Sequence, residues 1–297
     1  MENVILRDNG YEATIELKGA QLVSLKDKTG REYIWQRDPE VWPKCSPILF
    51  PVIGNLKDNK IKINGVEYTM GKHGILRDAP YEITEQTTNS VTMVTRYTEE
   101  TLTAYPFKYE VTMKFILNNG KIKVMHNVKN IDDKEMIYCI GAHPGLICPL
   151  YDGECLEDYV LKFEHTETTS SVKYDLVNQY FDANSHEPFL ENSDTFPLSY
   201  EAFVDDAIFC NKLKSREVKI LNPKTNKGVS VAFPGFETVA FWTKYGDGYK
   251  NYVCVEPWNG SAVFSDEVKG EFKEKRGALT LNPSSERLHI MDIEILD

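Results

Sequence analysis

The segment 136–145 contains a histidine placed where a proton-transfer residue would be useful. His143 follows an apolar run, 136–140, and precedes Pro144 and Gly145. Pro144 disfavours helix at His143 and keeps its backbone extended, so we expect the imidazole at the end of a strand. An imidazole titrates near neutral pH and can donate or accept a proton there. His143 is therefore a candidate proton donor or acceptor, and a hydrogen-bonded structural histidine is the alternative.

Glu256 is the second candidate, because it ends a strongly apolar run. It follows residues 252–255 and precedes Pro257 and Trp258. Carboxylates are seldom buried without a partner or a chemical role. Burial beside Trp258 would raise the pKa of the Glu256 carboxyl and make it a better base. Together with His143, this residue predicts general acid–base catalysis, and a buried structural glutamate is the alternative.

The segment 72–78 carries an imidazole, a guanidinium and a carboxylate close together. His73, Arg77 and Asp78 lie within it, beside Gly74, which permits a tight backbone turn. This mixture suits the binding of a polar ligand. The alternative is a charged turn in which Arg77 and Asp78 form an exposed pair of little energetic value.

Two adjacent acids, Asp205 and Asp206, precede the apolar residues 207–209. A carboxylate at the start of a strand can accept hydrogen bonds from two hydroxyl groups of a sugar. We therefore include Asp206 among the candidate binding residues. A solvated turn is the alternative, since aspartate is common in turns.

Motifs for nucleotides, acyl transfer and metals are absent from the sequence. It contains no Gly-x-x-x-x-Gly-Lys-Ser/Thr, no Gly-x-Gly-x-x-Gly after a strand and no Gly-x-Ser-x-Gly. The six histidines also lack metal-ligand spacing such as His-x-x-x-His, so we expect neither a metal nor an organic cofactor. We expect His126 to point inward as a structural residue, and His165, His186 and His289 to be exposed.

Charge and composition narrow the class of protein. The 297 residues include 34 Lys and Arg against 45 Asp and Glu, a formal net charge of −11. This excess of negative charge repels phosphate backbones and argues against nucleic acid or an anionic membrane as a partner. The first residues do not show the pattern of a signal peptide and no run of about 18 apolar residues occurs, so we expect neither a signal peptide nor a transmembrane helix. The six scattered cysteines are expected to be buried free thiols in a reducing cytoplasm.

Alternation of apolar and polar residues predicts an all-β fold. It extends over 107–117, turns at Asn118-Asn119-Gly120 and resumes over 122–128, which indicates a long antiparallel hairpin with one buried face. Shorter strands are predicted at 11–17, 60–70 (around an Asn64-Gly65 turn), 90–97, 217–221 and 229–233. Helical periodicity is weak, and 266–275 is the best candidate helix. With no repeat or linker, we expect residues 1–297 to form one sandwich or barrel domain. We expect Trp35 and Trp42 to pack in its core, and the alternative is that they stack, with Tyr33, on the face of a sugar.

Short motifs occur in an order that resembles the aldose 1-epimerase (galactose mutarotase) family, especially its smaller bacterial members. In chain order they are Ser46-Pro47-Ile48-Leu49-Phe50-Pro51-Val52-Ile53-Gly54-Asn55, the His-Gly-x-x-Arg-Asp of 73–78, Tyr105-Pro106-Phe107, the Gly-Ala-His-Pro-Gly of 141–145, Asp206-Ala207, Ser215-Arg216-Glu217-Val218, Phe241-Trp242-Thr243 and Cys254-Val255-Glu256-Pro257-Trp258. Each string is short, and the ordered set is what makes the resemblance specific.

The resemblance implies a large antiparallel β-supersandwich with a sugar site on a concave face. It also implies an isomerase that interconverts the α and β anomers of a free aldose, such as galactose or glucose, without a metal or cofactor. On the matching positions, it implies that Glu256 is the general base and His143 the general acid.

The same resemblance implies binding roles for four other residues. His73 would hold or polarise the ring-oxygen side of the sugar, and Asp206 would bind its hydroxyl groups. Arg77 would lie at the rim or orient the site. Asn55 falls in the loop where relatives often present Asn or Arg to the sugar, and here that residue is uncharged.

Three other functions remain open at this point. The first is a hexose-6-phosphate 1-epimerase, for which Arg77, Arg96 and Lys72 are the available cations, although the sequence shows no clear basic cluster. The second is a carbohydrate-binding protein without turnover. The third is a glycoside hydrolase that uses Asp206 and Glu256 as paired carboxylates. In each case the expected partner is a small-molecule sugar, and the chain is expected to be a monomer or a homodimer.

Overall fold

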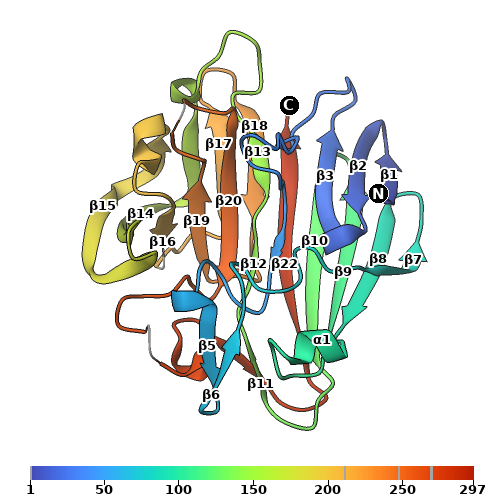
Figure 1. Cartoon of the computed structure of the whole chain (residues 1–297). Coiled ribbons are helices and arrows are strands. Elements are labelled where there is room, and N and C mark those ends of the chain that lie inside the picture. The colour runs from blue at the N-terminus through green and yellow to red at the C-terminus, as the bar shows by residue number, and fades with distance from the viewer. Residues whose placement is uncertain (1, 211, 247, 268–269) are drawn as a thin grey trace.

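The computed structural model describes residues 2–210, 212–246, 248–267 and 270–297, and antiparallel strands dominate them (Figure 1). The largest sheet has 15 strands. In spatial order these are β4 (Ile48–Leu49), β12 (Ile140–Ala142), β20 (Tyr252–Asn259), β19 (Thr238–Trp242), β16 (Ile208–Cys210), β14 (Val160–Asp175), β17 (Glu217–Asn222), β18 (Lys227–Ala232), β22 (Glu286–Leu296), β10 (Lys121–Asn130), β9 (Tyr109–Asn118), β8 (Ser90–Arg96) and β7 (Glu82–Gln86), with β13 (Gly145–Ile147) beside β20 and β15 (Tyr180–Pro197) beside β14. The all-β prediction is confirmed.

Three smaller sheets complete the β structure. They are β1 (Asn3–Asp8), β2 (Tyr11–Glu16) and β3 (Gln21–Lys26); β5 (Lys60–Ile63) and β6 (Val66–Thr69); and β11 (Met136–Tyr138) and β21 (Leu279–Leu281). The first of them lies against β8 and β9, so two layers of sheet enclose the core there (Figure 1).

Helical structure is confined to short pieces. These are α1 (Glu99–Leu102) and the 3₁₀ turns η1 (Lys18–Ala20), η2 (Lys57–Asn59), η3 (Leu156–Asp158), η4 (Tyr200–Phe203) and η5 (Phe272–Glu274). The helix predicted over 266–275 is wrong, because its described part contains only η5; residues 268 and 269 lie outside the described ranges. Within those ranges, no helix is long and apolar enough to cross a membrane.

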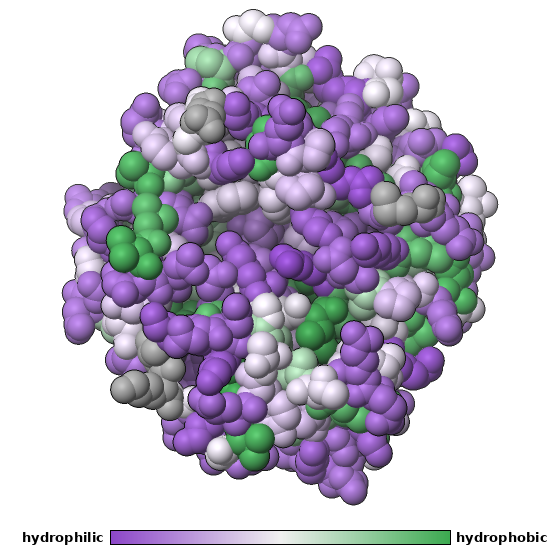
Figure 2. All heavy atoms as spheres, viewed as in Figure 1, coloured by the Kyte–Doolittle hydropathy of each residue, from purple (hydrophilic) through white to green (hydrophobic). Residues whose placement is uncertain are grey.

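The hairpin of β9 and β10 shows why the alternating pattern was informative. Every second residue of each strand is buried, and the two strands pair in unbroken register from Tyr109↔Asn130 to Asn118↔Lys121. Successive side chains of a strand point to opposite faces, so one face of the hairpin joins the core. The other face meets solvent, and Figure 2 shows a surface dominated by hydrophilic side chains, with hydrophobic ones in small groups.

Two buried histidines lie opposite each other on neighbouring strands. His126 on β10 faces His289 on β22, and they are 2% and 0% exposed. The inward orientation of His126 is confirmed, whereas the prediction that His289 is exposed is wrong. Alternation along β22 carries His289 inward together with Met291. Its Nδ1 accepts a hydrogen bond from Asn259 (2.8 Å), so the neutral ring carries its proton on Nε2, 3.1 Å from the Tyr138 hydroxyl.

The cysteines follow the sequence prediction at five of six positions. All six are free, and five are buried: Cys45, Cys139, Cys148, Cys210 and Cys254. Cys155 is exposed instead, because it precedes the surface turn η3 and its backbone N–H is bonded to Asp158 (3.0 Å).

We expect acid to destabilise the fold through these buried histidines. Burial lowers the pKa of His126 from 6.5 to about 3 and that of His289 to about 4. Between those values and 6.5 the unfolded chain binds protons that the folded chain does not, so the free energy of unfolding falls as pH falls, by up to about 1.4 kcal/mol per pH unit for each histidine. Denaturant titrations at a series of pH values measure this slope.

His126→Gln is expected to lower stability at neutral pH but to flatten the pH dependence, because the group that titrates is gone. His165→Gln is the matched control, since His165 is exposed on the surface and should leave the slope unchanged. Equal slopes in the parent protein and in His126→Gln would contradict this account.

Candidate active site

A gap between two short strands brings His143 opposite Glu256. Strand β12 pairs with β20 through Gly141↔Trp258, and β13 pairs with the same strand through Gly145↔Cys254. Continuing the register from either side places His143 across from Glu256, where directly opposed side chains share one face of the sheet.

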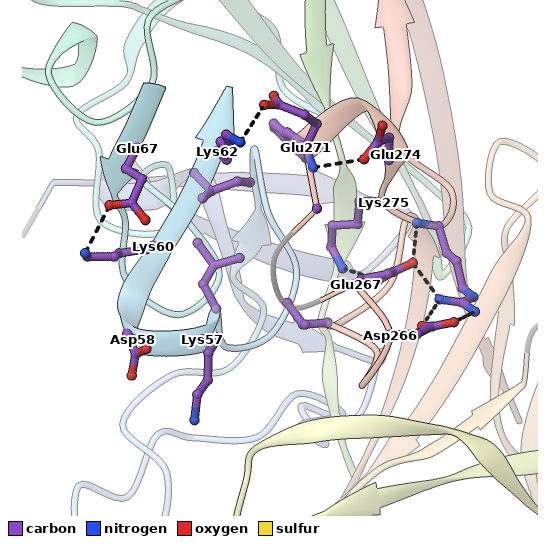
Figure 3. A pocket seen from close by; sticks show the side chains of 16 residues that line it. Lys57, Asp58, Lys60, Lys62, Glu67, Asp266, Glu267, Glu271, Glu274 and Lys275 are labelled. Atoms are coloured by element: carbon purple, nitrogen blue, oxygen red, sulfur yellow. Dashed lines mark hydrogen bonds and ion pairs between the residues drawn. The ribbon is translucent and has the colours of Figure 1, made fainter. Parts of the chain in front are cut away.

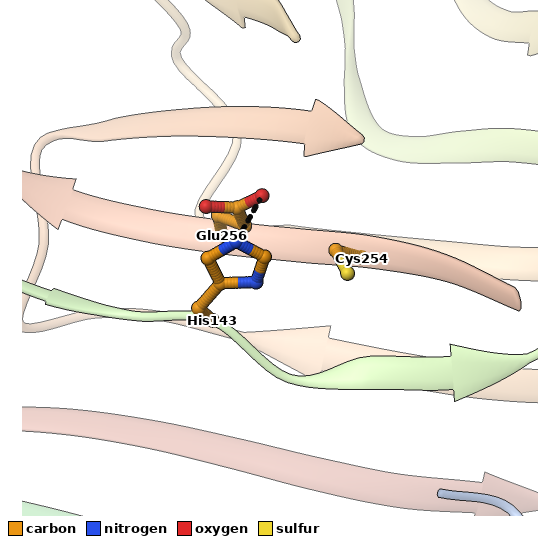
Figure 4. A group of neighbouring side chains, drawn as sticks. All are labelled: His143, Cys254 and Glu256. Carbon is orange, nitrogen blue, oxygen red and sulfur yellow. Dashed lines mark ion pairs between the residues drawn. The ribbon is translucent and has the colours of Figure 1, made fainter. Parts of the chain in front are cut away.

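The two side chains are in direct contact. His143 Nε2 lies 3.2 Å from Glu256 Oε1, and the residues are 6% and 2% exposed (Figure 4). The Trp42 ring covers the imidazole, with 4.9 Å between ring centroids. The pair is therefore largely sheltered from solvent, with apolar surface on one side.

Burial disfavours the charged form of both groups. It lowers the pKa of His143 to about 3 and, with help from the nearby Asp206 carboxylate, raises the pKa of Glu256 well above its usual value. A single proton shared by the pair leaves it neutral overall, whether that proton lies on nitrogen or on oxygen. Since desolvation penalises net charge, this one-proton state is the favoured one around neutral pH.

A second imidazole is held beside the pair by backbone contacts. His73 Nδ1 accepts the Gly54 N–H (3.1 Å), so its proton is on Nε2, and its ring lies 5.7 Å from that of His143. His73 has φ +64° and Gly74 has φ +76°. A Cβ on Gly74 would lie 2.1 Å from the Phe50 carbonyl oxygen, so only glycine fits there. Burial lowers the pKa of His73 well below 6.5 and keeps this donor neutral.

Asp206 is positioned from another direction by the turn that follows η4. Its backbone has φ +75°, and its Oδ1 accepts the Trp242 indole N–H at 2.6 Å. Burial raises the pKa of its carboxyl, and the positive charge of Lys72 opposes that shift. One carboxylate oxygen is thus tied to the protein and the other remains available to a ligand.

Asn55 and Arg77 occupy the outer part of the same cavity. Asn55 Nδ2 lies 3.4 Å from the Tyr174 hydroxyl, which comes from the distant strand β14. Arg77 is partly exposed, and its Nε lies 3.6 Å from Asp78 Oδ2. The surface pair expected as the alternative for Arg77 is present, but the residue also lines the cavity.

All six residues predicted from the sequence line one cavity of about 490 Å³: Asn55, His73, Arg77, His143, Asp206 and Glu256. The cavity is also lined by Trp42, for which stacking on a sugar was the alternative, and by residues with no site role predicted from the sequence, among them Tyr174, Trp242, Lys244 and Trp258. Trp35 packs on Tyr252 as expected of a core residue, but the core assignment of Trp42 is wrong. Arg96 lies elsewhere, on β8, where it pairs with Glu110 (2.6 Å).

One group of side chains in the described ranges has the geometry to hold a metal ion. The ligand atoms of His143, Cys254 and Glu256 lie within 4.8 Å of one another (Figure 4). The same imidazole and carboxylate form the hydrogen-bonded pair, so an ion bound here would displace the shared proton. The pair can therefore serve acid–base chemistry or hold a metal ion, but it cannot do both at the same time.

Sequence comparison finds one matching family and similar proteins from a bacterium. The sequence pattern described as aldose 1-epimerase matches residues 2–276. Protein LacX of Lactococcus lactis subsp. lactis, in its plasmid form, is 36% identical over 262 residues, which are 86% of this chain and 87% of that protein. The chromosomal form of LacX gives the same values.

Solved structures agree with the sequence match. A galactose mutarotase related enzyme from Lactobacillus acidophilus superposes with a TM-score of 0.92 at 29% identity, over 100% of this chain and 98% of that one. A galactose mutarotase-like protein from Lactobacillus casei has the same fold, with a TM-score of 0.89 at 22% identity over 99% and 100% of the two chains. With a family pattern that covers most of its length, this chain belongs to the aldose 1-epimerase family.

Proposed function

We propose that this protein is an aldose 1-epimerase that interconverts the α and β anomers of a hexose by opening and closing the sugar ring. The observation that carries the proposal is the contact between His143 Nε2 and Glu256 Oε1, buried at the wall of a cavity large enough for a hexose. Ring opening removes a proton from the anomeric hydroxyl and adds one to the ring oxygen. A pair that holds a single proton can do both.

In the proposed mechanism, the Glu256 carboxylate takes the proton of the O1 hydroxyl while the His143 imidazolium gives its proton to O5. The C1–O5 bond breaks, and C1 becomes an aldehyde carbon. The pair now holds its one proton on Glu256 instead of His143. Rotation about C1–C2 presents the other face of the aldehyde, and the reversed transfers close the ring and restore the pair. Each positioned acid or base contributes about 10²–10⁴-fold to such a reaction.

The surrounding groups suit the binding of a polyhydroxylated ring. His73 offers an Nε2–H donor and Asp206 a carboxylate acceptor, both held rigidly. The Trp42, Trp242 and Trp258 rings supply apolar surface for the sugar's C–H groups. The buried Trp258 indole N–H lies within reach of the Glu256 carboxyl, where it opposes the rise in the pKa of that group.

The alternatives fit the arrangement less well. A protein that only binds sugar has no need of a desolvated imidazole and carboxyl in contact, because burying them costs free energy. A glycoside hydrolase depends on two carboxyl groups that flank the scissile bond, whereas the closest ionisable partner of Glu256 is an imidazole.

Glu256→Gln is expected to reduce the rate of anomer interconversion by about 10²–10⁴-fold, because an amide cannot accept the O1 proton. Galactose binding should remain measurable by calorimetry, since the amide keeps the size of the side chain. Polarimetry of freshly dissolved α-D-galactose measures the rate. Glu67→Gln, at an exposed position on β6, is the matched control and should keep the parent rate. Near-parent activity of Glu256→Gln would remove the base from the mechanism.

A bell-shaped dependence of the rate on pH is expected for the parent protein. A second proton on the pair blocks the base, and because burial lowers the pKa of His143, this acid limb falls below the usual histidine value of 6.5. Loss of the shared proton leaves no acid, and because burial raises the pKa of Glu256, this limb falls above the usual glutamate value of 4.5. Rates measured by anomer exchange in NMR across this range test the profile.

His143→Asn should greatly reduce the rate of anomer interconversion and abolish its bell-shaped pH dependence, because only the carboxyl group of the pair then remains. The exposed His165 provides the control His165→Asn, which should keep both. A flat profile in the parent protein would argue against a shared-proton pair.

A further inference from the structure

A second cavity, of about 840 Å³, lies beside β5, β6 and η5 and shares no lining residue with the candidate active site. It is rich in charge, but most of its charged groups neutralise one another (Figure 3). Lys60 pairs with Glu67 (3.1 Å), Lys62 with Glu271 (3.7 Å), Lys275 with Glu267 (3.5 Å) and Arg276 with Asp266 (2.6 Å). Such a cavity offers little uncompensated charge to a ligand.

The charge balance of the candidate active site is different. Lys44, Lys72, Arg77 and Lys244 line its cavity, against the two carboxyl groups of Asp206 and Glu256. This cationic excess occurs in a chain whose formal net charge is −11. The sequence shows no clear basic cluster, because the four residues come from three separate segments that only the fold brings together.

The outer cations of this cavity are only partly compensated. Lys44 lies 2.5 Å, Arg77 3.6 Å and Lys18 3.4 Å from the carboxylate of Asp78, so three positive charges share one negative charge. Lys244 Nζ contacts a backbone carbonyl oxygen (3.4 Å) and forms no ion pair within the described ranges. The outer part of the cavity, formed by Lys44, Arg77 and Lys244, therefore has a positive electrostatic potential.

Lys72 is, like Lys244, a cation of this cavity without a charged partner among the described residues. It is exposed and forms no ion pair with any described residue. It lines the cavity together with His73, His143, Asp206 and Glu256. Its positive charge helps to lower the pKa of the two histidines and opposes the raised pKa of the two carboxyl groups. A neutral sugar would give this exposed ammonium group no ion-pair partner, whereas an anionic sugar would.

Building on the proposed function, we infer that the substrate is an anionic aldose, with a phosphate or carboxylate group at its C6 end, and that Lys72 is the residue that recognises the anion. In a hexopyranose, C6 is attached to C5, the neighbour of the ring oxygen. If His143 protonates that oxygen, the C6 substituent lies on the His143 side of the sugar, and Lys72 lines the same cavity as His143. The rim cations would attract the same anion from solution.

Anomer exchange measured by NMR at equilibrium tests this inference, because it needs no isolated anomer. The probes are D-galactose, D-galactose 6-phosphate and D-galacturonate. We expect kcat/KM to be at least about tenfold higher for one or both anionic sugars than for galactose, since hydrogen bonds to charged groups are the stronger kind. This advantage should shrink as ionic strength rises. Comparison of kcat/KM for galactose 6-phosphate and for galacturonate shows whether the anionic group is a phosphate or a carboxylate.

Lys72→Met should reduce kcat/KM for the preferred anionic sugar at least about tenfold more than for galactose, mainly through KM. Lys57→Met is the matched control: Lys57 is also exposed but lines the other cavity, so the ratio between the two sugars should not change.

The possible results separate the two proposals. If the parent protein accelerates galactose exchange and neither anionic sugar is preferred, the anionic-substrate inference is overturned and the epimerase proposal stands. An equal loss on neutral and anionic sugars in Lys72→Met would overturn the role of Lys72 as the anion-recognising residue. If no sugar is accelerated, the proposed function fails, and the inference that rests on it fails too.

Discussion

The site depends on the cost of placing an imidazole and a carboxyl group together out of water. Neither group is stable in its charged form alone at that depth, but as a contacting pair they can hold one proton and remain neutral. The sheet makes the contact possible, because the ladder of β20 is interrupted at His143 and Pro144, between β12 and β13. Proline has no backbone N–H to contribute to a ladder. The interruption thus falls where a side chain must face a cavity instead of packing into the core.

Two of the loops around the pair hold side chains by unusual backbone conformations. His73 and Asp206 both have positive φ values, which most residues avoid. Such conformations typically cost about 1–3 kcal/mol and persist where surrounding contacts fix them. Here the contacts are the Gly54 N–H on His73 and the Trp242 indole on Asp206. Both side chains are therefore oriented before any ligand binds, which reduces the ordering that binding requires.

The net charge of the whole chain is negative, whereas the charged residues that line the cavity carry an excess of positive charge. The surface is strongly acidic, which disfavours polyanions that would have to contact a broad face of it. A small anion that enters the cavity meets a different field, because screening limits the influence of surface carboxylates to about 10 Å at ordinary salt. The net charge of the chain therefore disfavours binding of nucleic acid more strongly than binding of a charged sugar.

The sequence by itself determined the fold class, and it singled out the residues for which we propose a role in the reaction. Alternation over 107–128 predicted the β9–β10 hairpin, because side-chain direction in a strand repeats every two residues and is a local property. His143 and Glu256 stood out because each interrupts an apolar run, which is also local.

Contacts between distant segments were decided only by the tertiary structure. The positive lining of the cavity, the Trp42 ring over His143 and the Tyr174 hydroxyl beside Asn55 join residues far apart in the chain. The burial of His289 depends on a partner strand more than 150 residues away, β10. Sequence spacing does not encode which strands become neighbours in a 15-stranded sheet, because that order results from the packing of the whole chain.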